Sequence, residues 1–419
     1  MWAYITEDVV STSKAEYEFP TIAKIMKASS PFRIVIVGGG IAGITAAIAL
    51  RAPNRRLIVL EQARLNKEIG ALISLQPNAS KIVYDTFGLG SELENARGMI
   101  DEGFRIYSTD GELVNEIPLT IKAEYGGTES QLKSESRLAW SDAILGGEYR
   151  LRERRKVEGD MIIGADGIHS ALRNYVVDSD LTPMPTGYSA YRLMIPSDIL
   201  EEKERDFCSK IDPRSSFTSM MVAHNCRLIM SPGRQGDVYG IVALVPDEKM
   251  NEDPNVKQSW VAEGNLNKML ETFSEFPEWV TGIFKHSPDL GLWQLRDIDP
   301  LPAWSRDRLI LIGDAAHAML PTQGQGASQA IEDSEALGAF FADTVDAPSL
   351  KEITKSFGDI FRSRHGRASL IQGYSRQAAK PGTAKGEKSV TMKPDEFMAF
   401  NCVYNGAKEW FQRQATSNA

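Results

Sequence analysis

Cysteine is scarce in this chain of 419 residues, and no apolar run is long enough to span a membrane. The three cysteines, Cys208, Cys226 and Cys402, are odd in number and far apart, which fits neither a disulfide framework nor a metal-ligand cluster. We therefore expect a reducing, cytoplasmic location and no bound metal. The longest apolar stretch, Ile34 to Leu50, has seventeen residues and carries four glycines. Residues 1–31 lack the apolar core of a secretory signal and are expected to be an N-terminal extension.

Basic charge is also in deficit, because 47 lysines and arginines stand against 56 aspartates and glutamates, for a net charge of −9. Without a basic field, the chain is not expected to bind nucleic acid. No internal repeat or low-complexity tract is visible, and the length allows two or three domains. We expect a globular monomer or homodimer whose partner is a small molecule.

The first of three glycine-containing signatures lies between a predicted strand and a predicted helix. Arg33 to Val37 is a β-branched run typical of a strand, and Ile41 to Leu50 has the pattern of a helix. Gly38 and Gly40 permit a tight turn and the close approach of a pyrophosphate. Gly43 lets helix and strand pack closely, and the helix N-terminus offers free N–H groups to an anion.

A carboxylate supports a nucleotide at this turn. The next predicted strand, Arg56 to Leu60, ends in Glu61, eighteen residues past Gly43, which is the usual range for an acid that binds the adenosine ribose. An acid at this position favours FAD or NAD over NADP. The alternative is a glycine turn that binds no ligand.

The second and third signatures each end a predicted buried strand. The second is Gly164-Ala165-Asp166-Gly167, followed by a helix that opens at Ser170. The third is Gly313-Asp314, where the carboxylate is placed to accept hydrogen bonds from a sugar-like polyol. The helical pattern from Ala327 onward would aim its N-terminal N–H groups at the Gln325-Gly326 turn, which favours a negative charge such as that of a reduced flavin.

The middle of the chain has the pattern of a second, antiparallel sheet. Four strands are predicted, Tyr188 to Ile195, Phe217 to Val222, Arg227 to Met230 and Val238 to Val245. Residues 261–285 and the chain after Leu350 are predicted to be helical. We expect an N-terminal extension (1–31), a FAD-binding domain in two parts (32–180 and 301–345), a substrate domain (181–300) and a C-terminal helical region (346–419).

With the three signatures in this order, the chain resembles the group A, single-component FAD-dependent aromatic monooxygenases, the salicylate and para-hydroxybenzoate hydroxylase family. The resemblance runs from about Phe32 to Met319 and into the following helix, and it includes Lys67 to Ala79. It implies an α/β fold with a Rossmann-like FAD-binding domain, an inserted antiparallel-sheet substrate domain and a helical C-terminus. It also implies that NAD(P)H reduces the flavin and that O₂ then supplies one oxygen atom to a phenolic or other electron-rich aromatic. We expect this activity to serve secondary metabolism.

Carried over residue by residue, the resemblance implies a set of FAD-binding positions. They are Gly38, Gly40, Gly43, Glu61, Ala71, Asp166, Asp314, Pro321, Gly326 and Ala327. Asp166 would also serve NAD(P)H, and Pro321 would lie against the flavin ring. His317 belongs to the strand-end motif and is expected to be structural rather than catalytic.

The candidate catalytic residues are Arg192 and Tyr239. Strand alternation puts Arg192 on the same face as Tyr188, Ala190 and Met194. Arg192 resembles the arginine with which fungal members steer a phenolate; the alternative is a sheet-edge arginine paired with an acid. The partner tyrosine of such enzymes falls to Tyr239 or is missing, and His224 is a weaker candidate.

Two features depart from the family pattern. The sequence of the family's His-Arg-x-Asp-Leu-His helix is missing, and only thirty-three residues separate Tyr125 from Gly159. The helix expected over 136–145 is the nearest substitute, with Arg137 in place of the missing arginine. Leu72 stands where the family usually has glycine. Three hypotheses follow: a hydroxylase of aromatics, an epoxidase of an alkene or indole, and a degenerate flavin-fold protein without turnover.

Overall fold

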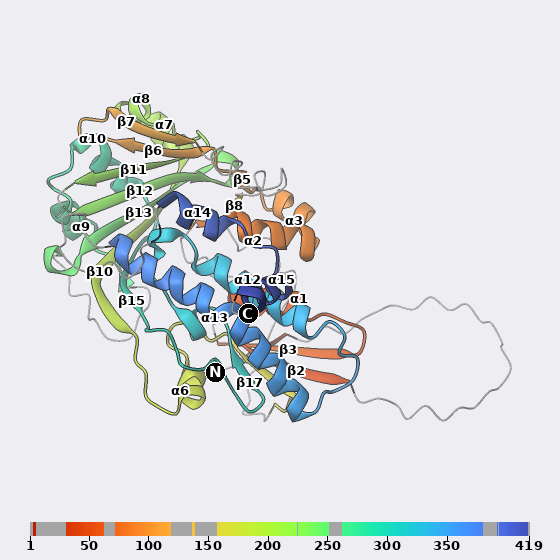
Figure 1. Cartoon of the computed structure of the whole chain (residues 1–419). Helices are drawn as coiled ribbons and strands as arrows, with labels where there is room; N and C mark the ends of the chain where they lie inside the picture. Colours follow the sequence, from red (N-terminus) through yellow and green to blue (C-terminus); the bar gives the residue numbers. More distant parts are fainter. Residues whose placement is uncertain are drawn as a thin grey trace, which may run out of the picture.

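The computed structural model describes residues 3–5, 31–62, 72–118, 136–138, 157–223, 225–250, 262–379, 392 and 394–417. Two large sheets dominate this part of the chain, and the C-terminal helices lie between them in Figure 1. No helix in these ranges is long and apolar enough to cross a bilayer. The mixed α/β fold with C-terminal helices confirms the predicted fold class.

The first sheet has the parallel core of a Rossmann-like domain. Its order is β1 (Ala3–Ile5), β3 (Arg55–Glu61), β2 (Phe32–Val37), β9 (Met161–Gly164), β17 (Leu309–Leu311) and β16 (Ser305–Arg306). The four central strands are parallel, and β1 and β16 pair antiparallel at the edges. The three signatures therefore come together, because parallel strands end at one edge of a sheet. Strand β1 lies within the predicted N-terminal extension.

The second sheet has eight described strands. Its order is β14 (Ala262–Glu263), β15 (Leu290–Asp297), β10 (Met184–Pro196), β13 (Val238–Pro246), β12 (Cys226–Gly233), β11 (Phe217–Ala223), β6 (Gly103–Tyr107) and β7 (Leu113–Pro118). All four predicted strands are present. Strands β6 and β7 correct the expected domain boundary, because they precede residue 181 and yet continue this sheet, through a parallel pairing of β6 with β11.

A small third sheet corrects the helix predicted over 136–145. Strand β8 (Ser136–Leu138) pairs with β4 (Ile73–Ser74) on one side and β5 (Met99–Ile100) on the other. Both neighbours offer backbone hydrogen-bonding groups, so this stretch is extended where it is described. Residues 139–145 lie outside the described part.

Helices cover both large sheets. In chain order they are α1 (Ile41–Ala49), α2 (Pro77–Lys81), the π-helical η1 (Ile82–Thr86), α3 (Gly90–Asn95), α6 (Ala171–Val177), α7 (Ser197–Lys203), α8 (Arg205–Lys210), α9 (Leu266–Thr272), α10 (Glu278–Thr281), α11 (Asp314–His317), α12 (Gly326–Phe340), α13 (Leu350–Ala379), α14 (Pro394–Cys402) and α15 (Ala407–Ser417). Short 3-10 turns are η2 (Arg234–Gly236), η3 (Asp247–Lys249), η4 (Gly282–His286) and η5 (Pro321–Gln323).

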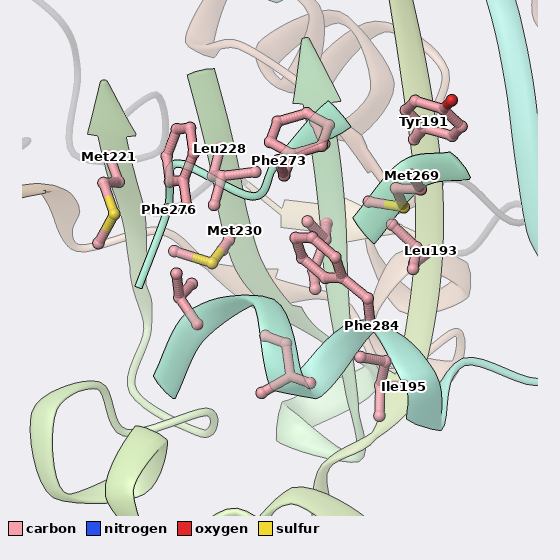
Figure 2. Close-up of a cluster of buried hydrophobic side chains, with 14 of the residues drawn as sticks. Tyr191, Leu193, Ile195, Met221, Leu228, Met230, Met269, Phe273, Phe276 and Phe284 are labelled. Carbon is pink, nitrogen blue, oxygen red and sulfur yellow. The ribbon is translucent and has the colours of Figure 1, made fainter. Parts of the chain in front are cut away.

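The outer face of the second sheet holds one hydrophobic core. Tyr191, Leu193 and Ile195 of β10 point toward Phe273 and Phe284, which come from the segment that covers this face (Figure 2). Because side chains alternate along a strand, the residues between them point to the opposite face. That opposite face lines a cavity.

Candidate active site

A cavity of about 1360 Å³ lies between the two sheets. Its first wall consists of the loops that follow β2, β9 and β17 together with the N-terminus of α12. Its second wall is the inner face of the second sheet, and α13 and α14 contribute further lining residues. Ligand pockets commonly measure 300–1,000 Å³, so this space has room for more than one small molecule.

The glycine turn after β2 is built by close packing on one side and by open space on the other. Gly38 has a φ of +112°, and a Cβ there would lie 2.1 Å from the carbonyl oxygen of Ala165. A Cβ at Gly43 would lie 1.9 Å from the carbonyl oxygen of Gly38, so α1 packs directly on the turn. A Cβ at Gly40, in contrast, would meet no atom within 4 Å, and Gly40 lines the cavity. The turn thus leaves its free surface at the N-terminus of α1.

Glu61 lies beside this turn. The Gly39 N–H donates to Glu61 Oε2 at 2.6 Å. The carboxylate at the end of β3 is therefore held next to the glycines, as the spacing of the sequence predicted.

Asp166 caps the helix that follows the second signature. Its Oδ2 accepts hydrogen bonds from the N–H groups of Ala171 (2.9 Å) and Leu172 (3.3 Å), at the start of α6. Its other oxygen, Oδ1, is buried and has no hydrogen-bond partner in the described part of the chain. Gly167, with a φ of +74°, lines the cavity beside it.

Asp314 projects into the cavity from the third signature. It follows Gly313, whose φ is +58°, and its side chain is exposed toward the cavity that it lines. Surrounding protein raises the pKa of the Asp314 carboxyl through desolvation, although His317 and Arg173 act in the opposite direction. No hydrogen bond to another described residue engages this carboxylate, so its oxygens can accept hydrogen bonds from a ligand.

His317 lies behind the cavity wall. It is 1% exposed, and its Nε2 is 2.6 Å from Asp333 Oδ2. The same oxygen accepts a hydrogen bond from the Gly313 N–H at 2.9 Å. His317 thus helps to hold the turn that precedes Asp314, which fits the structural role expected for it.

The remaining predicted cofactor residues are distributed as follows. Pro321, Gly326 and Ala327 line the cavity where α12 begins. Ala71 lies outside the described residues. Arg137 is described in its backbone only, and its pairing with Ser74 puts that backbone beside a residue that lines the cavity.

Arg192 lines the cavity from the central strand β10, which lies between β15 and β13. Its guanidinium carbon lies 4.7 Å from the centre of the Trp293 ring, in a cation–π contact. Burial lowers the pKa of Arg192, and Nε is buried without a hydrogen-bond partner among the described residues. No described acid forms an ion pair with it, so the alternative of a sheet-edge arginine paired with an acid does not fit this geometry.

Tyr239 corrects the sequence expectation. It lies opposite Ile195 in the β10–β13 pairing, whereas Arg192 lies opposite Val242, so the two side chains leave the sheet on opposite faces. The Tyr239 ring is 1% exposed and packs edge-on against Phe207 in the outer core. It does not line the cavity. His224, the weaker candidate, lies outside the described residues.

Comparison with known proteins supports a flavin site at this position. A model described as an FAD binding domain matches residues 290–352, and another of the same description matches residues 33–67. Salicylate hydroxylase of Pseudomonas putida is 31% identical over 373 residues, which cover 79% of this chain and 82% of that protein. The chain belongs to the group A FAD-dependent aromatic monooxygenases.

Two further comparisons extend over most of the length of this monooxygenase. 3-Hydroxybenzoate 6-hydroxylase 1 of Aquipseudomonas alcaligenes is 27% identical over 408 residues, covering 88% of this chain and 97% of that protein. The solved structure of a salicylate hydroxylase substrate complex superimposes with a TM-score of 0.66 at 24% identity, covering 93% and 96% of the two chains. The enzyme class, an FAD-dependent oxidoreductase, is confirmed, and the solved structure supports the fold.

The cavity of the monooxygenase fits FAD. Gly40 and Gly326 both line it, and a Cβ at either would meet no protein atom within 4 Å. The N-termini of α1 and α12 supply backbone N–H groups for negatively charged parts of a ligand. The Asp314 carboxylate supplies an acceptor between them.

Sequence reasoning missed the arginine that joins the second and third signatures. The Arg173 side chain is fully buried, and it donates to the carbonyl oxygens of Ile168 (2.7 Å), Asp314 (2.8 Å) and Ala315 (2.8 Å). It therefore holds the loop after β9 against the loop after β17. The available signal in the sequence was that Arg173 lies in the first turn of the helix that opens at Ser170, next to the second signature.

Sequence reasoning also missed a buried ionic cluster beneath α12. Glu332 and Asp333 on α12 pair with Arg364 on α13, and Arg367 pairs with Glu332. All four side chains are at most 1% exposed. Asn78 donates to Glu332 at 2.6 Å, which ties α2 to the same cluster.

Proposed function

We propose that this protein is an NAD(P)H- and O₂-dependent hydroxylase of a phenolic or other electron-rich aromatic compound. The observation that carries the proposal is the cavity itself, in which FAD-site residues lie on one wall and Arg192 lies on the facing sheet. Relatives named for salicylate and 3-hydroxybenzoate hydroxylation support an aromatic substrate that bears a hydroxyl group. Secondary metabolism is the setting that we propose.

On the cofactor wall, Gly38, Gly40 and Gly43 would admit the FAD pyrophosphate to the N-terminus of α1, and Glu61 would accept hydrogen bonds from the ribose. Asp314 would bind the polyol chain. Ala71, Arg137, Asp166, Pro321, Gly326 and Ala327 complete the proposed set. Once bound, the flavin supplies the redox and oxygen chemistry, while the protein supplies orientation and excludes water.

On the substrate wall, Arg192 would bind the ionised hydroxyl group of the substrate. Its guanidinium is buried against Trp293 and has no described acid to neutralise it. A phenolate placed there gains a charge-assisted hydrogen bond and remains in its more electron-rich form. Arg192 thus orients the ring and favours the reactive ionisation state.

NAD(P)H would bind beside Asp166, and we place the protein in the cytoplasm because its three cysteines are odd in number and widely spaced in the sequence. The segment around Ser136–Leu138 is short, but it still contributes a strand next to the cavity. An epoxidase that acts on an alkene or indole is the second candidate, because the apolar part of the cavity would also accept such a substrate.

The visible spectrum of the purified protein, recorded before and after addition of NADPH, tests the proposal. We expect flavin absorption that bleaches with NADPH and NADPH consumption that rises with a panel of phenols. Stimulation by alkenes or indoles alone would favour the epoxidase. Absence of flavin absorption even after FAD is added would refute the proposed function.

Asp314→Ala tests the cofactor wall in the same assay. We expect this variant to purify without flavin, because it removes the carboxylate that opens into the cavity. Normal FAD retention would refute the role assigned to Asp314.

A further inference from the structure

Leu72 reaches the second sheet from the segment that leads into the small third sheet. It immediately precedes β4 and lines the cavity. On the facing sheet its side chain meets two glycines, Gly233 at the end of β12 and Gly240 in β13. A Cβ built at Gly233 would lie 2.5 Å from Leu72 Cδ2, and one built at Gly240 would lie 2.6 Å from Leu72 Cδ1.

The two glycines are required by space and not by backbone conformation. Gly233 has a φ of −146° and a ψ of 172°, an extended conformation that any residue adopts. Gly240 lies inside β13, paired with Met194 and Ser231, and its φ is not positive. A larger residue would therefore suit the backbone at both positions, but it would collide with Leu72.

The contact between Leu72 and Gly240 lies close to Arg192, the proposed anchor of the substrate. Gly240 and Val242 lie two residues apart on the cavity face of β13, and Val242 lies opposite Arg192. Two residues of a strand span about 7 Å. A phenolate held at Arg192 and pointing along β13 therefore has about this length available before it meets Leu72.

We propose that Leu72 is a specificity-determining residue that limits the length of the aromatic substrate. Its isobutyl group fills the space that Gly233 and Gly240 leave open at the edge of the cavity. The inference rests on the proposed function, because it takes Arg192 as the anchor of the phenolate.

The test compares wild type with Leu72→Ala for binding of 4-alkylphenols, from 4-methylphenol to 4-butylphenol, measured by flavin difference spectra of the FAD-loaded protein. We expect the ratio of the Kd for the long phenol to the Kd for the short one to fall by about tenfold or more in Leu72→Ala, since a methylene in an apolar pocket changes discrimination by 10–200-fold. Leu57→Ala is the matched control, because Leu57 lies on β3 of the first sheet, is half-buried and does not line the cavity. An unchanged ratio in Leu72→Ala would overturn the proposal.

A melting cycle tests the packing without any substrate. We expect Gly240→Ala to lower the apparent Tm by roughly 2 to 6 °C when Leu72 is present, because the added Cβ overpacks the contact. In Leu72→Ala the same substitution should cost almost nothing, because the two Cβ atoms would then lie 3.6 Å apart. Additive shifts would overturn the assignment of Leu72. Failure of the wild type to bind any phenol would instead overturn the proposed function, and the melting cycle distinguishes the two failures.

Discussion

Asp333 connects the buried ionic cluster to the turn that carries Asp314, and Asp333→Asn tests whether this connection positions the FAD site. Oδ2 accepts from the Gly313 N–H at 2.9 Å and lies 2.6 Å from His317 Nε2, while Oδ1 accepts from Arg364 Nε at 3.0 Å. Asparagine has one oxygen. If that oxygen keeps the contacts to Gly313 and His317, its NH₂ group faces the Arg364 N–H, which is also a donor.

The expected loss follows from these contacts. A buried charge-assisted hydrogen bond is replaced by two opposed donors, but Arg364 keeps its pairing with Glu332. We therefore expect the free energy of unfolding to fall by about 2 to 4 kcal/mol. Movement of the asparagine away from Arg364, which relieves the opposed donors, would shift the Gly313 turn and misalign Asp314 with the FAD polyol. Loss of one such hydrogen bond raises the FAD Kd by about 10- to 100-fold.

The dependence of stability on pH shows whether the ionised form of Asp333 stabilises the fold. Burial alone would raise the pKa of Asp333, but His317 and Arg364 outweigh it and hold the pKa below its ordinary value. An unfolded aspartate titrates near pH 3.9, so ionised Asp333 stabilises the fold above that pH. This contribution is lost as the pH falls from about 4 toward the folded-state pKa. The stability difference between wild type and Asp333→Asn should therefore shrink in acid.

FAD fluorescence titration and urea unfolding measure the two effects separately. Glu335→Gln is the matched control, because Glu335 lies on the same helix and is buried, but it accepts from the Ala407 N–H and Tyr404 instead of the Gly313 turn. We expect this control to keep its FAD affinity. Equal FAD affinities in Asp333→Asn and wild type, or equal losses in Asp333→Asn and the control, would refute the positioning role.

Two further predictions concern the walls of the cavity. Gly40→Ala should fold normally and bind FAD more weakly, whereas Gly43→Ala should fail to fold, because its Cβ would lie 1.9 Å from the Gly38 carbonyl oxygen; circular dichroism and FAD titration check both, and a folded Gly43→Ala would contradict the packing. Arg192→Ala should lower kcat/KM for phenols by about 10- to 100-fold, with Arg192→Lys intermediate because lysine lacks the planar fork; an unchanged kcat/KM would remove Arg192 from the site.

The cofactor wall was predictable because its residues follow local rules. Glycines between a strand and a helix, and a Gly-Asp pair at the end of a buried strand, have short-range causes that sequence spacing displays. The placement of Tyr239 has a long-range cause. Its face depends on the register of β13 against β10, two strands that are separated in the chain by α7, α8, β11 and β12, and a shift of one residue would move the side chain to the other face.

The residues that support the wall were not predictable for the same reason. Arg173 reaches Asp314 across 141 positions of the sequence, and Arg364 reaches Asp333 across 31. Neither arginine lies at a sequence spacing from its partner that would predict the contact. The contact of Leu72 with Gly233 and Gly240 was not predictable either. The sequence shows that Leu72 departs from the family pattern, but it does not show that these two glycines leave space for it.

The shortened segment before the second signature affects one end of the proposed FAD site more than the other. The supports of Asp314 are Arg173, Asp333 and Arg364, and all three come from chain segments beyond residue 157. The missing family helix would instead have met the pyrophosphate, which lies beside Gly40 in the proposed arrangement. We therefore expect the trimming to weaken FAD binding at the pyrophosphate while leaving the turn that carries Asp314 in place. The pyrophosphate end and the polyol end of the proposed FAD site can thus be weakened separately in this chain, because different parts of the sequence determine them.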